Sequence, residues 1–277
     1  MKRILLFGII LCSSSLATFA QSFDIQKPIT ITPHISIQNF DWLERSIVGR
    51  AGVQIQFQPS KKLNLTLDAS VFNSLGNFAN FNSNVSASSI ADDNGKYGVT
   101  YTAPGIATTG NSASPKINYQ GAFMNVDAGI PIKLGDSSRT TIEPFVSVEG
   151  KIWSRSVDYG TEKNPLIYEE KYKFLSPALG AKLRYNTKSK VKLSLRISAS
   201  YPVISKLKTD SKNLINPNAE IDLTKWLSPS VELGVRVKKI TLKLRYERIN
   251  VGTADSIRGS GPASRADVTG FSIGYDF

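Results

Sequence analysis

Charged side chains recur at every second position in several segments of this sequence, alternating with apolar ones. In one such segment the cations Lys243 and Arg245 share a face with Glu247, opposite Leu242 and Leu244. Opposite charges on one face can form ion pairs where water is excluded. Where water reaches them, they can set up a transverse field that selects small charged solutes. The spacing therefore predicts an ion-pair network or a solute path rather than covalent chemistry.

Candidate residues for catalysis are few. His34 is the only histidine and Cys12 the only cysteine, and the sequence contains no calcium loop rich in Asp and Glu. Activating water or a serine at neutral pH usually needs a positioned base such as histidine, and most metal sites use His, Cys or clustered carboxylates. We therefore expect no enzymatic activity, no metal and no cofactor. His34 is expected to be an inward polar residue that is hydrogen-bonded to a neighbour.

The amino-terminal residues have the pattern of a secretory signal peptide. Residues 1–3 read Met-Lys-Arg, residues 4–11 are apolar, and residues 18–20 form a small-x-small cleavage site. Lipid attachment at Cys12 is disfavoured because the large Leu11 precedes it. We predict a signal peptide over residues 1–20 and a single mature domain over 21–277. No later apolar run approaches the roughly 20 residues of a membrane helix, so the mature chain is either soluble or crosses a membrane as a closed barrel.

Two-residue alternation over about 9–12 positions, the length of a tilted transmembrane strand, recurs along the rest of the chain. The pattern predicts an all-β fold, a closed antiparallel transmembrane β-barrel of about ten strands, although eight or twelve also fit. The expected strands are approximately 31–40, 50–58, 63–73, 119–134, 140–157, 173–186, 190–205, 228–237, 240–251 and 267–277.

The connections between these segments alternate in length. Short turns are expected at 59–62, 135–138, 187–189 and 238–239, and long loops at about 41–49, 74–118, 158–172, 206–227 and 252–266. Short turns at one end and long loops at the other are typical of transmembrane barrels. With an even strand number, both ends of the chain lie at the short-turn end. Residues 74–118 are interpreted as a surface loop, with a plug inside the barrel as the alternative.

The last residues alternate in the same way and end on an aromatic side chain. Phe271, Ile273, Gly274, Tyr275 and Phe277 resemble the signal by which the bacterial barrel-assembly machinery recognises its clients. This resemblance to outer-membrane barrels implies a Gram-negative outer-membrane location, with that machinery as a partner during biogenesis. It also implies that the short turns lie in the periplasm and the long loops outside the cell.

Ten strands also resemble the size of omptins, the outer-membrane proteases whose site places Asp and His residues at the extracellular rim. This sequence departs from that pattern, because His34 lies towards the expected periplasmic end. Outer-membrane phospholipases and lipid A deacylases, which pair Ser with His, are similarly poor models. An omptin-like protease remains a remote alternative, with Asp41, Glu44, Asp158 and Asp222 as its candidate rim acids.

The charged positions on the expected inner face divide along the chain. Acidic residues belong mainly to the first half and basic residues to the second; the predicted lumen network is Asp68, Asp127, Glu143, Glu149, Lys182, Arg184, Lys192, Arg196, Glu232, Arg236, Lys243, Arg245 and Glu247. In a ten-strand lumen, long side chains can reach across. One hypothesis is therefore a charge-paired and largely closed lumen, with a structural or surface-interaction role for the loops. The alternative is a narrow porin-like channel.

The net charge of +12 suggests anionic partners. Because an exported protein rarely meets nucleic acid, we expect outer-membrane lipid and lipopolysaccharide as partners and no nucleic acid. The long loops could bind an extracellular ligand or a host surface. Lysines at the short turns could contact lipid headgroups. Many aromatic residues lie near segment ends and are predicted to form interfacial girdles: Phe40, Trp42, Phe72, Tyr119, Phe123, Trp153, Tyr172, Phe174, Tyr185, Tyr201, Trp226, Tyr246, Tyr275 and Phe277.

Overall fold

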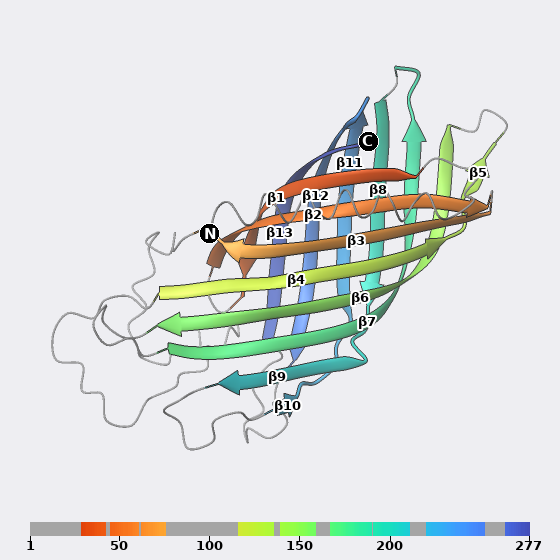
Figure 1. Ribbon diagram of the computed structural model, residues 1–277. Coiled ribbons are helices and arrows are strands. Elements are labelled where there is room, and N and C mark those ends of the chain that lie inside the picture. The colour runs from red at the N-terminus through yellow and green to blue at the C-terminus, as the bar shows by residue number, and fades with distance from the viewer. Residues whose placement is uncertain are drawn as a thin grey trace, which may run out of the picture.

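A computed structural model describes residues 29–42, 45–60, 62–75, 116–135, 139–158, 167–189, 191–210, 220–252 and 264–277. Within these residues the chain forms strands joined by turns and short connections (Figure 1). The strands are β1 (Thr30–Asp41), β2 (Arg45–Ser60), β3 (Leu63–Ser74), β4 (Lys116–Gly129), β5 (Ile132–Leu134), β6 (Thr140–Asp158), β7 (Ile167–Asn186), β8 (Val191–Ser200), β9 (Ile204–Asp210), β10 (Glu220–Asp222), β11 (Ser228–Val237), β12 (Ile240–Gly252) and β13 (Ser264–Tyr275).

Ten of these strands form one closed antiparallel barrel, in the order β1-β2-β3-β4-β6-β7-β8-β11-β12-β13. The last strand pairs with the first, where Ile273 lies opposite Ile35, so the sheet has no open edge there. Adjacent residues of each strand point to opposite faces, which explains the period of two in the sequence. The predicted all-β, ten-strand closed antiparallel barrel is confirmed.

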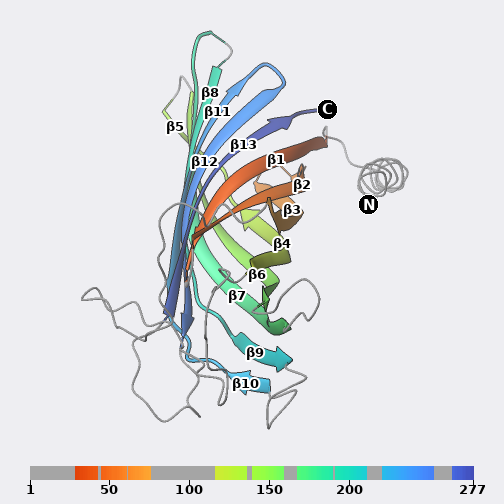
Figure 2. The ribbon, with the colours of Figure 1, turned by 90° about the vertical axis from the view of Figure 1, so that its left-hand side faces the viewer.

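The two ends of the barrel differ in their connections. At one end, Lys238 and Lys239 join β11 to β12, and residues 187–190 join β7 to β8. Lys238 adopts a positive φ of 55°, as tight hairpin turns require. The chain also ends there, where the Phe277 amide donates a hydrogen bond to the Ile31 carbonyl at 3.0 Å. Figure 2 shows these short turns at the top, near the carboxyl terminus. We call this the short-turn end and the opposite one the long-connection end.

Two of the expected strands are divided. Residues 190–205 form β8 and β9, separated at Tyr201, Pro202 and Val203, because proline has no amide hydrogen for the ladder. The register on β7 shifts there by one residue, from Ala178 opposite Ser200 to Leu175 opposite Ile204. The expected strand 119–134 likewise divides into β4 and β5.

Some loops expected from the sequence are shorter than predicted. β1 reaches Asp41 and β2 already begins at Arg45, so the connection is much shorter than 41–49. The 206–227 region contains most of β9 and all of β10, which extend the sheet beside β7. Residues 206–227 mix both charge signs and lack a clear apolar alternation, so the sequence predicted a loop rather than β9 and β10. The predicted signal peptide, the cleavage site and most of 74–118 lie outside the described residues.

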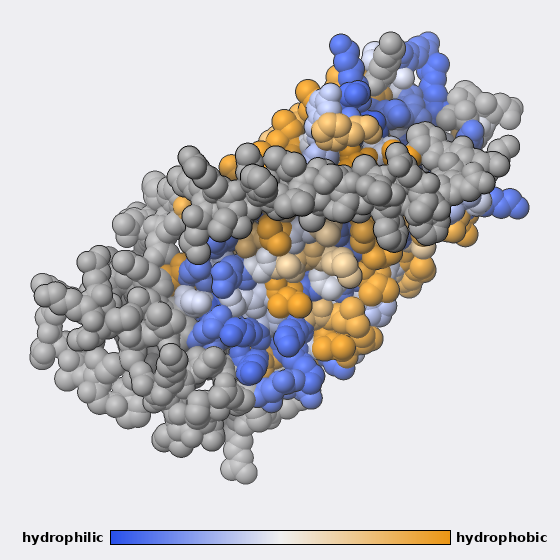
Figure 3. Space-filling view, viewed as in Figure 1, coloured by the Kyte–Doolittle hydropathy of each residue, from blue (hydrophilic) through white to orange (hydrophobic). Residues whose placement is uncertain are grey.

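The outward face of the barrel carries a continuous apolar belt. Val148, Leu179 and Leu244 expose 51%, 68% and 57% of their area. Figure 3 shows hydrophobic side chains gathered over the outer wall. Exposed apolar area on this scale is unusual for a protein surrounded by water and fits contact with lipid chains. Further members of the belt are Ile35, Ile37, Val71, Met124, Val126, Val146, Ile152, Leu193, Ile197, Leu233, Val235, Leu242, Phe271 and Ile273.

Candidate functional site in the barrel lumen

A buried lysine forms the centre of the charged lumen. Lys151 on β6 contacts Glu149 on the same strand at 2.8 Å and also Glu247 on β12, on another part of the wall. Arg245 contacts Glu247 at 2.9 Å and adds a second cation. The side chains of Lys151, Glu149 and Glu247 are each only 5–6% exposed. Buried charges are stable only when paired, so these residues bind one side of the barrel to another.

A second group of ion pairs lies nearer the short-turn end. Asp127 on β4 receives Lys182 at 2.8 Å and Arg196 at 3.3 Å. Glu143 on β6 is fully buried and contacts Arg184 at 3.0 Å and Lys182 at 3.5 Å. Lys182 lies directly opposite Glu143 in the β6–β7 register, so the backbone pairing itself brings these two charges together. Two carboxylates thus contact three cations, and Lys182 connects the two carboxylates.

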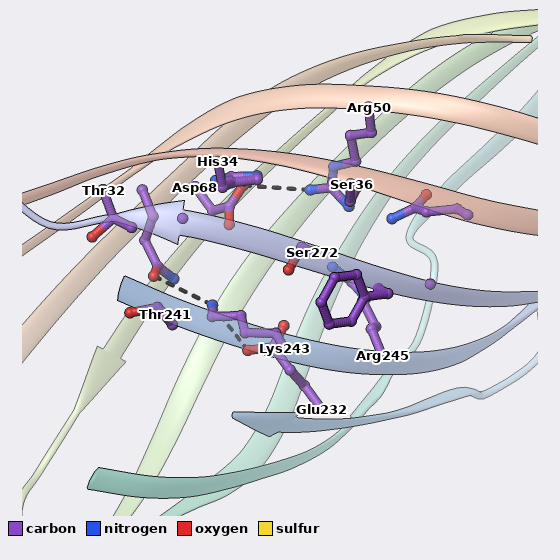
Figure 4. A pocket seen from close by; sticks show the side chains of 15 residues that line it. Thr32, His34, Ser36, Arg50, Asp68, Glu232, Thr241, Lys243, Arg245 and Ser272 are labelled. Atoms are coloured by element: carbon purple, nitrogen blue, oxygen red, sulfur yellow. Dashed lines mark hydrogen bonds and ion pairs between the residues drawn. The ribbon is translucent and has the colours of Figure 1, made fainter. Parts of the chain in front are cut away.

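A third group involves the single histidine (Figure 4). The His34 Nε2 lies 3.9 Å from Asp68, and Arg50 contacts the same carboxylate at 3.4 Å. On the facing strands, Lys243 pairs with Glu232 at 3.1 Å. A cavity of about 30 Å³ lies between these groups, which leaves space only for ordered water. His34 is therefore an inward residue beside a carboxylate and a guanidinium. The hydroxyl groups of Thr32, Ser36, Thr241 and Ser272 line the same pocket.

The structure places the residues of the predicted network on the inner face, and acids of the first half pair with bases of the second: Asp127, Glu143 and Glu149 contact Lys182, Arg184 and Arg196. Some of these pairs join neighbouring strands, as Glu143 and Lys182 do, whereas Asp127 on β4 and Arg196 on β8 come from strands that are not neighbours. Lys192 is exposed at the short-turn end and forms no ion pair with the described residues. Arg236 pairs with Asp276 at 2.6 Å.

Sequence reasoning missed several members of the network. Arg50, Lys151 and Asp276 all occupy inward positions and form ion pairs, as do Arg155 and Glu170, which pair with each other at 3.3 Å. Their parity along the strands could have identified them, since Lys151 has the same parity as Glu149. A single isolated charge between apolar neighbours was the weaker signal.

An aromatic cluster lies in the lumen between the charged residues and the long-connection end. We call it the aromatic seal: Phe40, Trp42, Phe72, Tyr119, Trp153, Tyr172 and Phe174. Trp153 stacks on Tyr172 and Phe174 with ring centroids 5.4 and 4.8 Å apart, and Trp42 meets Tyr172 edge-on at 4.9 Å. Each seal residue is at most 5% exposed.

Aliphatic residues from the remaining wall complete the seal. Val48, Ile249, Val251 and Val268 pack against the rings from β2, β12 and β13. Leu207 on β9 and Leu223, directly after β10, join the same cluster. The cluster thus receives side chains from most of the circumference, and these apolar groups pack against one another inside the barrel at this level.

The seal corrects the interfacial-girdle prediction for its seven aromatic residues. They point inward rather than towards lipid, because they share the strand parity of the lumen charges: Phe40 follows Ser36 and Gln38, and Trp153 follows Glu149 and Lys151. Aromatics that do face outward include Tyr185, Tyr201, Trp226 and Tyr275, which are 41–55% exposed. Position near a strand end therefore did not decide orientation, whereas parity did.

A polar cavity of about 370 Å³ lies among the charged residues and extends to Lys192 at the short-turn end. Its lining includes the cations Lys182, Arg184, Arg196 and Arg236 and the carboxylates Asp68, Asp127, Glu149, Glu232 and Asp276. None of the seal residues lines it. The lumen thus contains a charged cavity towards the short turns and packed apolar groups towards the long connections.

The predicted assembly signal lies on β13 and at the end of the chain. Phe271, Ile273, Tyr275 and Phe277 point outward and are 42–73% exposed. Gly274 points inward, where an added side chain would meet the Thr32 methyl group at 2.8 Å. The strand closes the barrel, as a final strand must, and recognition by the assembly machinery remains a prediction.

No protein-family model and no curated protein matches this sequence. Among solved structures, the chain is similar to a major outer membrane protein from Thermus thermophilus, with 8% identity, a TM-score of 0.43, and coverage of 91% of this chain and 100% of that chain. It is also similar to the outer membrane protease OmpT from Escherichia coli (11% identity, TM-score 0.43, coverage 92% and 98%). The translocator domain of the autotransporter NalP from Neisseria meningitidis is a third (12% identity, TM-score 0.39, coverage 98% and 96%).

The class of this protein follows from its own architecture. A closed barrel with an apolar outer belt and a charged, partly filled lumen defines a transmembrane β-barrel protein. In the part of the chain that the structure describes, no helix is long and apolar enough to cross a membrane. Among the same residues, no group of three or more His, Cys, Asp or Glu side chains is placed to hold a metal ion.

Proposed function

We propose that this protein is a non-conducting barrel of the bacterial outer membrane, with a structural or surface-interaction role through its long connections. The aromatic seal is the observation that carries the proposal. Water and ions cross a pore only where a continuous polar path exists, and packed rings at the long-connection end interrupt that path. The proposal gives the protein no catalytic role, because His34 lies deep in the lumen among ion-paired residues.

The charge network, on the short-turn side of the aromatic seal, supports the same conclusion. Lys151, Glu149 and Glu247 are paired and almost fully buried, so they are not available as free sites for a passing ion. A solute would have to break these pairs, which leaves buried charges uncompensated. Two different layers, one apolar and one ionic, therefore oppose conduction.

A narrow channel for small solutes is the second candidate. The polar cavity of about 370 Å³ favours it, since its volume and its lining of cations and carboxylates could hold a small charged solute. Conduction would then require the seal to open. The two candidates differ in whether the seal is permanent.

Single-channel recording tests the proposal. The refolded mature chain, inserted into a planar bilayer, is expected to show no conductance steps. A Trp42→Ala/Trp153→Ala variant is expected to conduct, because it removes two large buried rings from the seal. Tyr201→Ala/Trp226→Ala is the matched control, since it removes two exposed aromatic rings from the outer face. Heat-dependent gel mobility confirms insertion of each protein.

Steady ohmic steps from the unaltered protein would contradict the non-conducting barrel and support the narrow channel. A selectivity that changes on Arg196→Gln or Asp127→Asn would then assign its filter to the ion-paired residues. If the inserted Trp42→Ala/Trp153→Ala variant shows no conductance, the barrier to ions is the charge network rather than the aromatic rings.

A further inference from the structure

Four lysines form a compact square on the outer face of the barrel. The antiparallel register of β7 and β9 places Lys171 directly opposite Lys208, and Lys173 directly opposite Lys206. All four have the same strand parity as Leu175, which points outward. We call this group the lysine square. Directly opposite residues of an antiparallel pair have Cβ atoms about 4.5–5.5 Å apart, so the four ammonium groups can converge on one small anion.

The square is unfavourable for the fold taken alone, because like charges directly opposite repel each other. Carboxylates reduce this repulsion only in part. Glu169 contacts Lys171 at 3.1 Å, and Glu220 hydrogen-bonds Lys206. That hydrogen bond raises the pKa of Lys206 and lowers the pKa of Glu220, so both stay charged at neutral pH.

Two corners of the square have no close ion pair. Lys173 and Lys208 are exposed, and neither forms an ion pair with the described residues, although Glu220 interacts with both over a longer distance. Asp222 lies opposite Lys206, and the register of β7 and β9 places Asp210 opposite Glu169. Lys225 lies nearby, and its Nζ donates a hydrogen bond to the Val203 carbonyl.

The square lies at the edge of the apolar belt. The next outward pair on β7 and β9 is Leu175 opposite Ile204, 38% and 42% exposed. Ile152, opposite Lys173 on β6, is 54% exposed. Figure 3 shows hydrophilic residues over the long-connection part of β7 and β9, bordering hydrophobic residues along the wall. Cations thus meet apolar side chains at one level of the outer surface.

We propose that the lysine square binds the phosphate groups of lipopolysaccharide in the outer leaflet, while its acyl chains lie on Leu175, Ile204 and Ile152. Phosphate monoesters next to acyl chains match this surface, and ammonium groups bind them through charge-assisted hydrogen bonds. Lipopolysaccharide is chosen because the square lies at the long-connection end, which the resemblance to outer-membrane barrels places outside the cell. The inference holds whether or not the lumen conducts.

Affinity for lipopolysaccharide tests the site. Purified full-length protein in detergent micelles is titrated with fluorescent lipopolysaccharide. Lys173→Gln/Lys208→Gln, which removes the two corners without ion pairs, is expected to weaken binding about thirtyfold. Lys133→Gln/Lys188→Gln is the matched control, because it removes two exposed lysines at the short-turn end. Its affinity is expected to equal that of the unaltered protein.

The lipid is then varied to identify the recognised group. Dephosphorylated lipopolysaccharide is expected to bind the unaltered protein about as weakly as intact lipopolysaccharide binds the double variant. Unchanged affinity of that variant, or an equal loss in the control, would overturn the site. Phosphatidylglycerol vesicles that bind as tightly, through the same two lysines, would overturn the choice of lipopolysaccharide. Heat-dependent gel mobility shows that each variant is folded, so a loss of binding is not a loss of the barrel.

Discussion

At the scale of single residues, the lumen is governed by charge compensation. Lys151 is the clearest case, since its ammonium group is almost fully buried between Glu149 and Glu247 on different parts of the wall. An unpaired charge in such a place is expensive. Lys151 thus holds both carboxylates, and the trio connects β6 to β12 across the interior.

Replacing Lys151 by methionine should strongly destabilise the barrel. The change leaves two buried carboxylates with less compensation, and breaking a buried pair in this way costs about 3–5 kcal/mol. Urea unfolding of the refolded protein in lipid vesicles, followed by tryptophan fluorescence, measures the loss. Lys192→Met is the matched control, because Lys192 is exposed and forms no ion pair among the described residues; its effect should stay within about 0.5 kcal/mol.

A second substitution separates lost compensation from lost packing. Adding Glu149→Gln to Lys151→Met removes one of the two carboxylates, while Glu247 keeps its contact with Arg245, so most of the lost stability should return. If the double variant is less stable than Lys151→Met, the cost lies in hydrogen bonding or packing rather than in charge.

At the scale of strands, the period of two carried most of the predictable information. It located the ten barrel strands and separated outward residues such as Leu244 from inward ones such as Arg245, because a strand exposes alternate residues to two different solvents. Side-chain orientation of Trp153 followed from the same parity, yet its place near a strand end suggested a girdle. Interior aromatic packing depends on residues from many strands meeting at one level, and that level is set by register.

Register and interruptions were less accessible from the sequence. The break at Pro202 and the shift on β7 depend on which partner strand is present, and β9 is identified by pairing with β7 rather than by its own pattern. The lysine square is a consequence of this pairing. Neighbour contacts such as Glu143 with Lys182 likewise arise from the register between β6 and β7, which a single strand does not encode.

The two faces of the barrel wall should respond differently to one added charge. Leu244 on β12 is 57% exposed on the outer belt, so Leu244→Arg should cost about 2–4 kcal/mol near the middle of the bilayer. Ser194 on β8 points into the polar cavity, where an added guanidinium can reach water, so Ser194→Arg should be milder. Equilibrium unfolding in vesicles compares the two variants, and equal losses would contradict the assigned faces.

At the scale of the whole molecule, the barrel is asymmetric along its axis. The short turns, the start of β1, the carboxyl terminus and the charged cavity lie towards one end of the barrel. The aromatic seal, the β9–β10 extension and the lysine square lie towards the other end. A cavity that is closed towards one side faces only the other compartment. The physical roles of the cavity and of the lysine square therefore both depend on which end faces the outside of the cell.

Epitope insertion measures that orientation directly. A short tag inserted after Lys188, in the β7–β8 turn, should be inaccessible to antibody on intact cells and become labelled after the outer membrane is permeabilised. The same tag inserted between Asn94 and Gly95, in the long connection between β3 and β4, should be labelled on intact cells. Both insertions are made in connections rather than in strands, so the ladder that closes the barrel keeps its register. Heat-dependent gel mobility verifies folding of both proteins before labelling is compared. The opposite labelling pattern would place the seal and the lysine square at the periplasmic side, where the lysines would face inner-leaflet phospholipid, and would direct the charged cavity to the exterior.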